Sequence, residues 1–345
     1  MTATPVTSEE QPATGQPSST NAARVRRWAY PVALVVFYIV WLSYMISTSS
    51  WGLFTEFWPV SLTMSLGSFV AGATAEGGAA VAFPVFTKVL SIEPTTARTF
   101  GLLIQSVGMT FAGIVIIARR VPILPRVILW ASLGGVFGQI LGTYYIGLAS
   151  PYSKILFTFV ATVFGVALAI SRWALKWVPR QRMPSWTNGN RAVFLAIGVA
   201  GGIVAANTGS GIDMLTFIVL TLPIGIDEKV STPTTVIIMA INSIVGTFLH
   251  AVISQDIGIA FDYWLVAVPI VVLGAPAGAY FASRATRDNI IVLLLTLITI
   301  ELISTLVLVT FTTTAIIVTA IAVVMCGGWF WAMLHYRHSR LRSVP

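Results

Sequence analysis

The chain has 345 residues, of which 56% are hydrophobic and only 9% are charged, and its mean hydropathy is +0.87. A soluble domain carries about 25% charged residues, so this composition excludes a soluble globular protein and indicates a polytopic membrane protein. The net charge of +8 comes from 20 Lys and Arg against 12 Asp and Glu. These cations cluster in short loops beside apolar segments, where they orient helices in a bilayer, so nucleic-acid binding is not expected.

The start of the chain is polar. Residues 1–23 are rich in Thr, Ser, Pro and Gln, and we expect a disordered tail there. The first apolar run, from Trp28 to about Ser47, is long enough to span a bilayer, and no small-residue cleavage site clearly follows it. We therefore expect a retained transmembrane helix within residues 24–56. The single cysteine, Cys326, excludes a disulfide framework and a multi-cysteine metal site, and no metal or cofactor is expected.

Two of the apolar segments are unusually long. The segments are residues 28–48, 57–90, 96–118, 127–147, 153–171, 192–222, 231–252, 263–283, 290–310 and 313–334. Eight have the length of one helix, whereas 57–90 and 192–222 exceed thirty residues and have a Gly-rich polar centre. A straight helix of that length would reach about 50 Å, beyond a hydrocarbon core of about 30 Å, and two full spans would need about 40 residues. Each long segment therefore predicts a broken or re-entrant helical hairpin.

The loop charges favour such hairpins. If both long segments return to the side from which they enter and the N-terminus is cytoplasmic, only Lys88, Arg98 and Lys154 of the 20 Lys and Arg face outward. If each long segment crossed once, eight would face outward. Cytoplasmic loops carry an excess of Lys and Arg, so hairpins fit better, with both termini in the cytoplasm and the protein in the cell membrane. Residues 172–191 are then a basic cytoplasmic loop, and residues 311–345 a last transmembrane helix with a basic cytoplasmic tail.

The two hairpins begin two related halves. Residues 57–171 form a first repeat of one hairpin and three spans, and residues 192–310 form a second repeat that enters from the opposite side. "GQILGTY" at 138–144 and "GAPAGAY" at 274–280 share the pattern G-x-x-x-G-x-Y. The predicted fold class is therefore an all-α polytopic membrane protein built from two inverted-topology repeats.

The hairpin tips have a composition that suits an anion. They are "AGATAEGGAAVAFP" (71–84) and "AANTGSGIDM" (205–214), and interrupted helices in inverted repeats are typical of secondary transporters with a site near the bilayer midplane. Each returning half-helix would direct free backbone N–H groups and a positive dipole end at that site, and glycine lets a ligand approach the backbone. The predicted substrate-binding residues at the tips are Gly77, Gly78, Asn207, Thr208, Gly209, Ser210 and Gly211.

The helices that follow the tips complete the predicted site. Arg98 and Gln105 lie on one small-or-polar stripe of segment 96–118, and Asn242 lies on a weaker stripe in the other half. Arg98 would offer a planar donor fork to an oxyanion, or its side chain would extend to the outer headgroups instead. Gln105 and Asn242 would line the site or hydrogen-bond neighbouring helices.

Two acidic residues flank the tips. Glu76 and Asp213 would each couple transport to protons or cations, gate it, or cap the N–H groups of the adjacent half-helix. Glu301, in the middle of "TITIELIST", is a further candidate, for which pairing with another helix is the alternative.

Two other groupings do not support a site. Ser210 with His250 would be the dyad of an intramembrane serine protease, but "NTGSG" has Asn207 where that motif needs glycine, so no enzyme activity is expected. His335 and His338 lie in the basic tail "HYRHSRLR" and fit phospholipid headgroups better than a metal.

Over about residues 57–310 the chain resembles the TauE/SafE family of sulfite and sulfonate exporters, multispanning proteins with two related halves. The likeness rests on the glycine-rich tips with prolines downstream, on "TARTFGLLIQSVGMT" and "STPTTVIIMAINSIVG" after them, and on the G-x-x-x-G-x-Y helices. It implies export of sulfite or of an organosulfonate such as sulfoacetate.

We therefore expect a secondary transporter that exports a small anion by alternating access. The alternatives are an uptake carrier or passive channel for the same anions and, from another class, a membrane receptor or scaffold. The expected partners are the anion and the lipid bilayer, with proton or cation coupling and a homodimer as further expectations.

Overall fold

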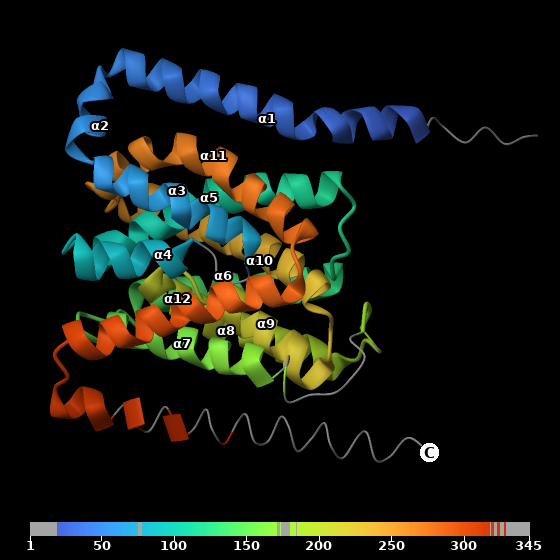
Figure 1. Ribbon diagram of the computed structural model, residues 1–345, viewed down its shortest axis with the longest axis vertical. Helices are drawn as coiled ribbons and strands as arrows, with labels where there is room; N and C mark the ends of the chain where they lie inside the picture. Colours follow the sequence, from blue (N-terminus) through green and yellow to red (C-terminus); the bar gives the residue numbers. More distant parts are fainter. Residues whose placement is uncertain are drawn as a thin grey trace, which may run out of the picture.

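The computed structural model describes residues 19–74, 78–170, 173, 180–183, 185–317, 319–320, 323–324 and 328. Within these residues the chain is all-helical and forms no β-strand, as the sequence predicts (Figure 1). Five residues considered above lie outside the described residues, and these are Glu76, Gly77, Cys326, His335 and His338.

The helices follow the predicted segments closely. They are α1 Ser19–Ser47, α2 Leu53–Glu56, α3 Trp58–Ala73, α4 Ala79–Pro84, α5 Pro94–Ala118, α6 Pro125–Tyr144, α7 Tyr152–Ala169, α8 Asn188–Thr208, α9 Ile212–Val219, α10 Glu228–Phe248, α11 Ala260–Arg284 and α12 Arg287–Leu308. π-Helical turns extend α4 over Val85–Val89, α9 over Leu220–Ile224 and α10 over Leu249–Ser254. Because α1 begins at Ser19, it takes in the end of the segment predicted as a disordered tail. Ala22 and Ala23 extend a helix at little cost once the apolar run has formed it.

Eight described helices are long and apolar enough to cross a membrane. Seven of them, α1, α5, α6, α7, α10, α11 and α12, match segments predicted as full spans. The eighth is α8, which the sequence predicts only as one arm of a hairpin but which has 21 residues. It is this long because it begins after the N-cap Thr187, whose Oγ1 accepts the N–H of Asn190 at 3.3 Å. The predicted span 313–334 is described only in part.

Both long apolar segments are interrupted where the sequence predicts a break. α3 ends at Ala73 and α4 begins at Ala79, and α8 ends at Thr208 and α9 begins at Ile212. In the second break Gly209 has φ +82° and Gly211 has φ +144°, values that residues with a Cβ rarely adopt. Gly78 has φ −68°, so it does not need the freedom of glycine.

The first arm of each hairpin packs against the other half of the chain. α3 lies along α11, and α8 lies along α6. The helices that follow the hairpins, α5 and α10, pack on each other, and α7 pairs with α12. Of the residues in the apolar stretch of each helix, 67% are buried in α5 but only 11% in α1. α5 therefore lies at the centre of the bundle and α1 at its edge (Figure 1).

The G-x-x-x-G-x-Y helices bring these arms into close contact. A Cβ on Gly138 of α6 would overlap the carbonyl oxygen of Val199 on α8, and a Cβ on Gly278 of α11 would overlap that of Phe69 on α3. Small residues let helices approach this closely in a bilayer, where the solvent supplies no hydrophobic drive. In both halves the motif therefore lies at a close helix contact, at its first glycine in α6 and at its second glycine in α11.

Prolines in α11 explain how α1 is attached. A helical proline has no N–H, so Pro269 and Pro276 leave the carbonyls of Leu265 and Val272, four residues earlier, without a helical donor. Trp41 on α1 donates its indole N–H to the Leu265 carbonyl at 3.0 Å, and the Tyr30 hydroxyl donates to the Val272 carbonyl at 3.1 Å. Both carbonyls are thus satisfied without water, as a membrane interior requires.

Candidate functional site

The tip of the second hairpin is held by α5. The Arg98 guanidinium donates from Nη1 to the Ala206 carbonyl at 3.2 Å, and the Gln105 amide donates to the Gly209 carbonyl at 2.6 Å. Between them Gly101 lies so close that a Cβ there would be 3.3 Å from the Cα of Gly209. The predicted stripe on α5 is therefore formed, and its polar side chains bind the backbone of the tip. Arg98 Nε and Gln105 Oε1 are buried and have no hydrogen-bond partner.

Asp213 occupies the N-terminal end of α9. Its carboxylate accepts the Gly211 N–H and the Met214 N–H, both at 3.0 Å, and the Ser210 hydroxyl at 3.1 Å. The Asp213 residue is only 1% exposed. The capping arrangement that the sequence left open is thus present, and a carboxylate stands where the sequence predicts the substrate anion.

Asn207 and Thr208 organise the same tip. The Asn207 amide accepts the Leu148 N–H at 2.7 Å and donates to the Ile146 carbonyl at 2.9 Å, which ties the tip to the chain between α6 and α7. Thr208 donates its hydroxyl to the Ser210 carbonyl at 2.7 Å. These contacts fix the loop around Gly209 and Gly211.

Asn242 hydrogen-bonds another helix and not the second tip. Its amide donates to the Gln139 side chain on α6 at 3.1 Å, and both residues are buried. Asn242 therefore forms the interhelical hydrogen bond that was the alternative to lining the site. Gln139, its partner, belongs to the quoted "GQILGTY" motif.

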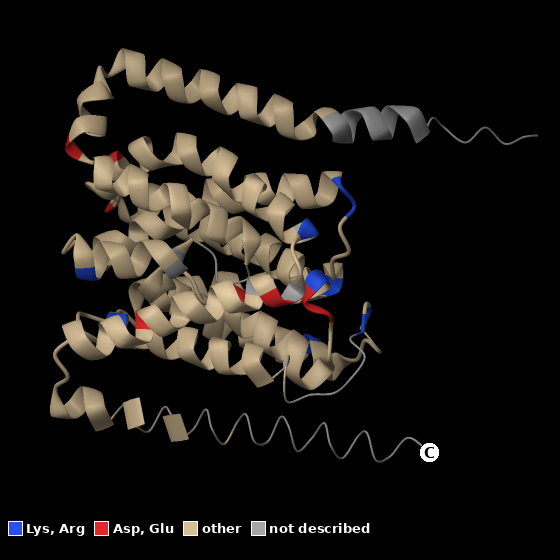
Figure 2. Ribbon diagram, in the orientation of Figure 1, with Lys and Arg blue, Asp and Glu red and all other residues tan. Residues whose placement is uncertain are grey.

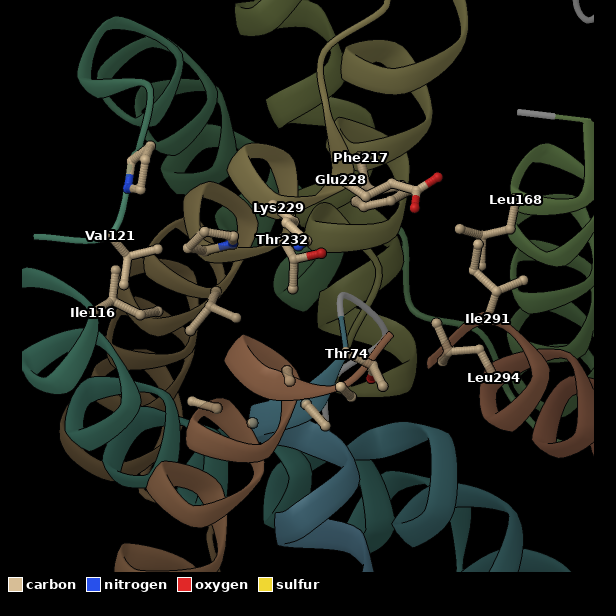
Figure 3. A pocket seen from close by; sticks show the side chains of 18 of the residues that line it. Thr74, Ile116, Val121, Leu168, Phe217, Glu228, Lys229, Thr232, Ile291 and Leu294 are labelled. Atoms are coloured by element: carbon tan, nitrogen blue, oxygen red, sulfur yellow. The ribbon is translucent and has the colours of Figure 1, made fainter. Parts of the chain in front are cut away.

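A cavity of about 330 Å³ lies between the two hairpins (Figure 3). Thr74, after the end of α3, and Phe217 of α9 bring the hairpins to its wall, and Glu228, Lys229 and Thr232 line it from the start of α10. The rest of the wall is mainly apolar and comes from α3, α5, α7, α10, α11 and α12, with Val121, Pro122, Gln181 and Ala285 from the loops. None of the described residues predicted to bind substrate lines it. The predicted residues at the second tip therefore lie outside the lining of this cavity.

Lys229 is the main polar feature that the sequence reasoning missed. It is the only Lys or Arg among the described residues that line the cavity, and it is exposed. From the sequence alone it is one of the loop cations expected on the cytoplasmic side. One signal could have found it, because Lys229 is the first cation of the helix after the second hairpin, as Arg98 is after the first.

The cavity opens toward the basic end of the molecule. Val121 and Pro122 line it from the loop that also carries Arg119, and Ala285 lines it directly after Arg284, the last residue of α11. Figure 2 shows that Lys and Arg gather mainly at this end of the bundle.

A second polar cluster lies at the return arm of the first hairpin. Lys88 pairs with Glu301 of α12 at 2.6 Å, with the two side chains 3% and 4% exposed. Lys88 also donates to Thr305 at 2.7 Å, and Thr158 of α7 donates to Glu301 at 2.6 Å. Glu301 therefore takes part in the helix pairing that the sequence left as an alternative.

His250 does not pair with Ser210. Its Nδ1 lies 2.8 Å from Asp256 Oδ1, while the Ser210 hydroxyl donates to Asp213. Among the described residues no group of three or more His, Cys, Asp or Glu is placed to hold a metal ion.

The family comparison decides the class of protein. The model of the family described as Sulfite exporter TauE/SafE matches residues 60–305, which contain α5 to α11 and all of both hairpins except the first two residues of α3. The chain belongs to the TauE/SafE family. Neither the comparison with curated proteins nor the comparison with solved structures gave a match. Members of the TauE/SafE family are membrane transporters of sulfite and organosulfonates, which agrees with the predicted class and with the eight span-length helices.

Proposed function

We propose that this TauE/SafE protein exports a sulfur oxyanion or organosulfonate across the cell membrane by alternating access, with both termini in the cytoplasm. The observation that carries the proposal is the cavity between the two interrupted hairpins, with Lys229 on its wall and its opening at the basic end. Because basic loops stay in the cytoplasm, this opening would face the compartment from which an exporter takes its substrate.

Two inverted repeats would supply the second, outward-open state. α3 on α11 and α8 on α6 are equivalent contacts with the halves exchanged, as a two-fold relation between inverted repeats requires. In such transporters one half rocks or slides against the other around a central site. The hairpins would then be re-entrant, with α9 and the short α4 as their return arms.

The anion would bind beside the first tip. The cavity reaches Thr74, which is followed by Glu76, Gly77 and Gly78 in the chain. We keep Gly77 and Gly78 as candidates and add Lys229 and Thr232, which supply an ammonium group and a hydroxyl. A cation and hydrogen-bond donors are what a sulfur oxyanion needs when it leaves water.

At the second tip the carboxylate of Asp213 would act as a gate. While it is ionised it takes the N–H groups that an anion would need. Protonation would weaken that cap and remove a negative charge from the site, so proton and anion binding would favour each other. Glu76 is the matching candidate in the first half.

The proposal is tested by counterflow in proteoliposomes. Labelled sulfite and sulfoacetate should exchange into vesicles that contain the protein, and Lys229→Gln should lower the apparent affinity for both about tenfold or more, since a charged hydrogen bond is worth about 1.5–3 kcal/mol. Lys229→Arg keeps the charge and should retain most of the apparent affinity. Uptake no faster than in protein-free vesicles would contradict the proposal, and equal activity of Lys229→Gln would remove Lys229 from the site.

A further inference from the structure

The wall of the cavity between the hairpins is divided into a polar and an apolar side. Glu228, Lys229 and Thr232 lie together on α10, and three apolar side chains lie across from them on α7 and α12, which are Leu168, Ile291 and Leu294 (Figure 3). The three apolar side chains come from two helices that pair with each other. A ligand that contacts both sides must therefore have a polar end and an apolar body.

The size of the cavity exceeds that of a bare sulfur oxyanion. Its volume is about 330 Å³, which falls in the range of pockets that hold organic ligands. A sulfite ion takes up roughly the space of two water molecules, each of about 30 Å³. Most of the cavity would then be filled by water against apolar side chains, which is an unfavourable way to occupy it.

The wall offers one cation and one carboxylate. Lys229 and Glu228 are neighbours on α10 and are the only charged residues among the described residues that line the cavity. One cation can compensate one negative charge, and the Glu228 carboxylate would repel a second. A dianion moved from water into a largely apolar site needs compensation for both charges, and each uncompensated charge is costly. A sulfonate with an apolar body carries a single permanent charge and removes the need for a second cation.

We infer that the preferred substrate is a monoanionic sulfonate with an apolar body, such as an alkanesulfonate of about four to six carbons, rather than sulfite or a dianionic sulfonate. The inference rests on the proposed function, because it assigns the substrate class of the same cavity. The sulfonate group faces Lys229 and Thr232, and the hydrocarbon body packs on Leu168, Ile291 and Leu294.

A chain-length series tests the inference. The competitors against counterflow of labelled butanesulfonate are methanesulfonate, butanesulfonate, hexanesulfonate, sulfite and sulfoacetate. Apparent affinity should rise about fourfold for each methylene group until the cavity is full, following the transfer free energy of a buried methylene group. Sulfite and sulfoacetate should compete more weakly than hexanesulfonate. Hexylammonium, which has the same chain and the opposite charge, should not compete.

Matched variants locate the effect in this cavity. Ala279→Leu places a larger side chain on the α11 wall, whereas Ala277→Leu on the same helix does so at an exposed position outside the cavity. The ratio of the affinities for hexanesulfonate and methanesulfonate should fall at least tenfold in Ala279→Leu and stay unchanged in Ala277→Leu. Leu294→Ser should lower the same ratio from the opposite wall.

The outcomes separate the two claims. If sulfite and sulfoacetate are transported but affinity does not rise with chain length, the inference is overturned and the proposed function stands. Inhibition by hexylammonium as strong as by hexanesulfonate would also overturn it, because the chain would then act through the lipid. If none of these anions is transported, the proposed function itself fails.

Discussion

The two hairpins have related sequences but are fixed in different ways. The tip of the second is bound to α5 through Arg98 and Gln105 and capped by its own Asp213. Thr74, at the end of the first arm of the first hairpin, lines the cavity instead.

The return arms of the two hairpins are also held by different kinds of contact. That of the first hairpin is tied to α12 by the buried pair of Lys88 and Glu301, whereas that of the second packs on α7 through the rings of Phe217 and Phe164, 5.3 Å apart. An ion pair in a dry site is directional, but an aromatic contact tolerates sliding. The difference indicates that the two hairpins are not held alike, since the second tip is braced by α5 and Thr74 of the first hairpin lines the cavity.

The largest effect is expected where the first return arm is held. Glu301→Leu leaves Lys88 buried without its carboxylate, and the free energy of unfolding should fall by about 3–5 kcal/mol. The double change Lys88→Met with Glu301→Leu should recover most of that loss. Phe217→Leu on the second arm should cost less than about 1.5 kcal/mol. Thermal unfolding in detergent measures all three, and equal losses in the single and double variants would show that packing rather than an unpaired charge is responsible.

The tip glycines should also respond unequally. At Gly211 the backbone has φ +144°, which a residue with a Cβ rarely adopts, and a Cβ there would be 2.5 Å from Val204 Cγ1. We therefore expect Gly211→Ala to lower the free energy of unfolding by about 2–3 kcal/mol. At Gly78, with φ −68°, a Cβ would meet Ala71 at an ordinary 3.5 Å, and alanine should change stability by no more than about 1 kcal/mol. The denaturation midpoints of the two variants measure this difference, and equal losses of stability would contradict the prediction.

A smaller effect on stability is expected at the cap of the second tip. Asp213→Asn keeps an acceptor for the Gly211 and Met214 N–H groups but removes the charge, so stability should fall by about 1 kcal/mol. If Asp213 couples transport to protons, the amide should support counterflow but not the response to an imposed pH gradient. A variant that concentrates substrate as the unmodified protein does would limit Asp213 to capping. Glu76→Gln is the matching test in the first half.

The smallest effect on stability is expected for the conservative change Arg98→Lys. Only Nη1 donates, and to a single carbonyl, so Arg98→Lys can keep the bond and should change stability by less than about 0.5 kcal/mol. Arg98→Ala should cost about 1.5 kcal/mol. The second readout is apparent affinity in counterflow. A large loss of affinity in Arg98→Lys at unchanged stability would mean that the guanidinium fork binds the anion and would weaken the contrast between the hairpins.

Much of the fold is predictable because its determinants are local. Hydropathy places seven of the spans, and the glycine-rich centres predict both helix breaks. The length of α8 was not predicted, because its start depends on the cap at Thr187 rather than on hydropathy. The stripe of Arg98 and Gln105 was predicted, but not that both side chains bind backbone carbonyls of the second tip.

The sequence by itself determined a membrane protein of apolar helices with two interruptions, a family resemblance and one strongly basic side, since each of these depends on residues close together in the chain. Only the tertiary structure decided which side chains share a cavity. Lys229, Leu168 and Leu294 come from three helices far apart in sequence, and they meet because α7 pairs with α12 beside the two hairpins. Helical periodicity defines the faces of one helix, but helix packing decides which faces meet, and that packing depends on contacts across the whole chain.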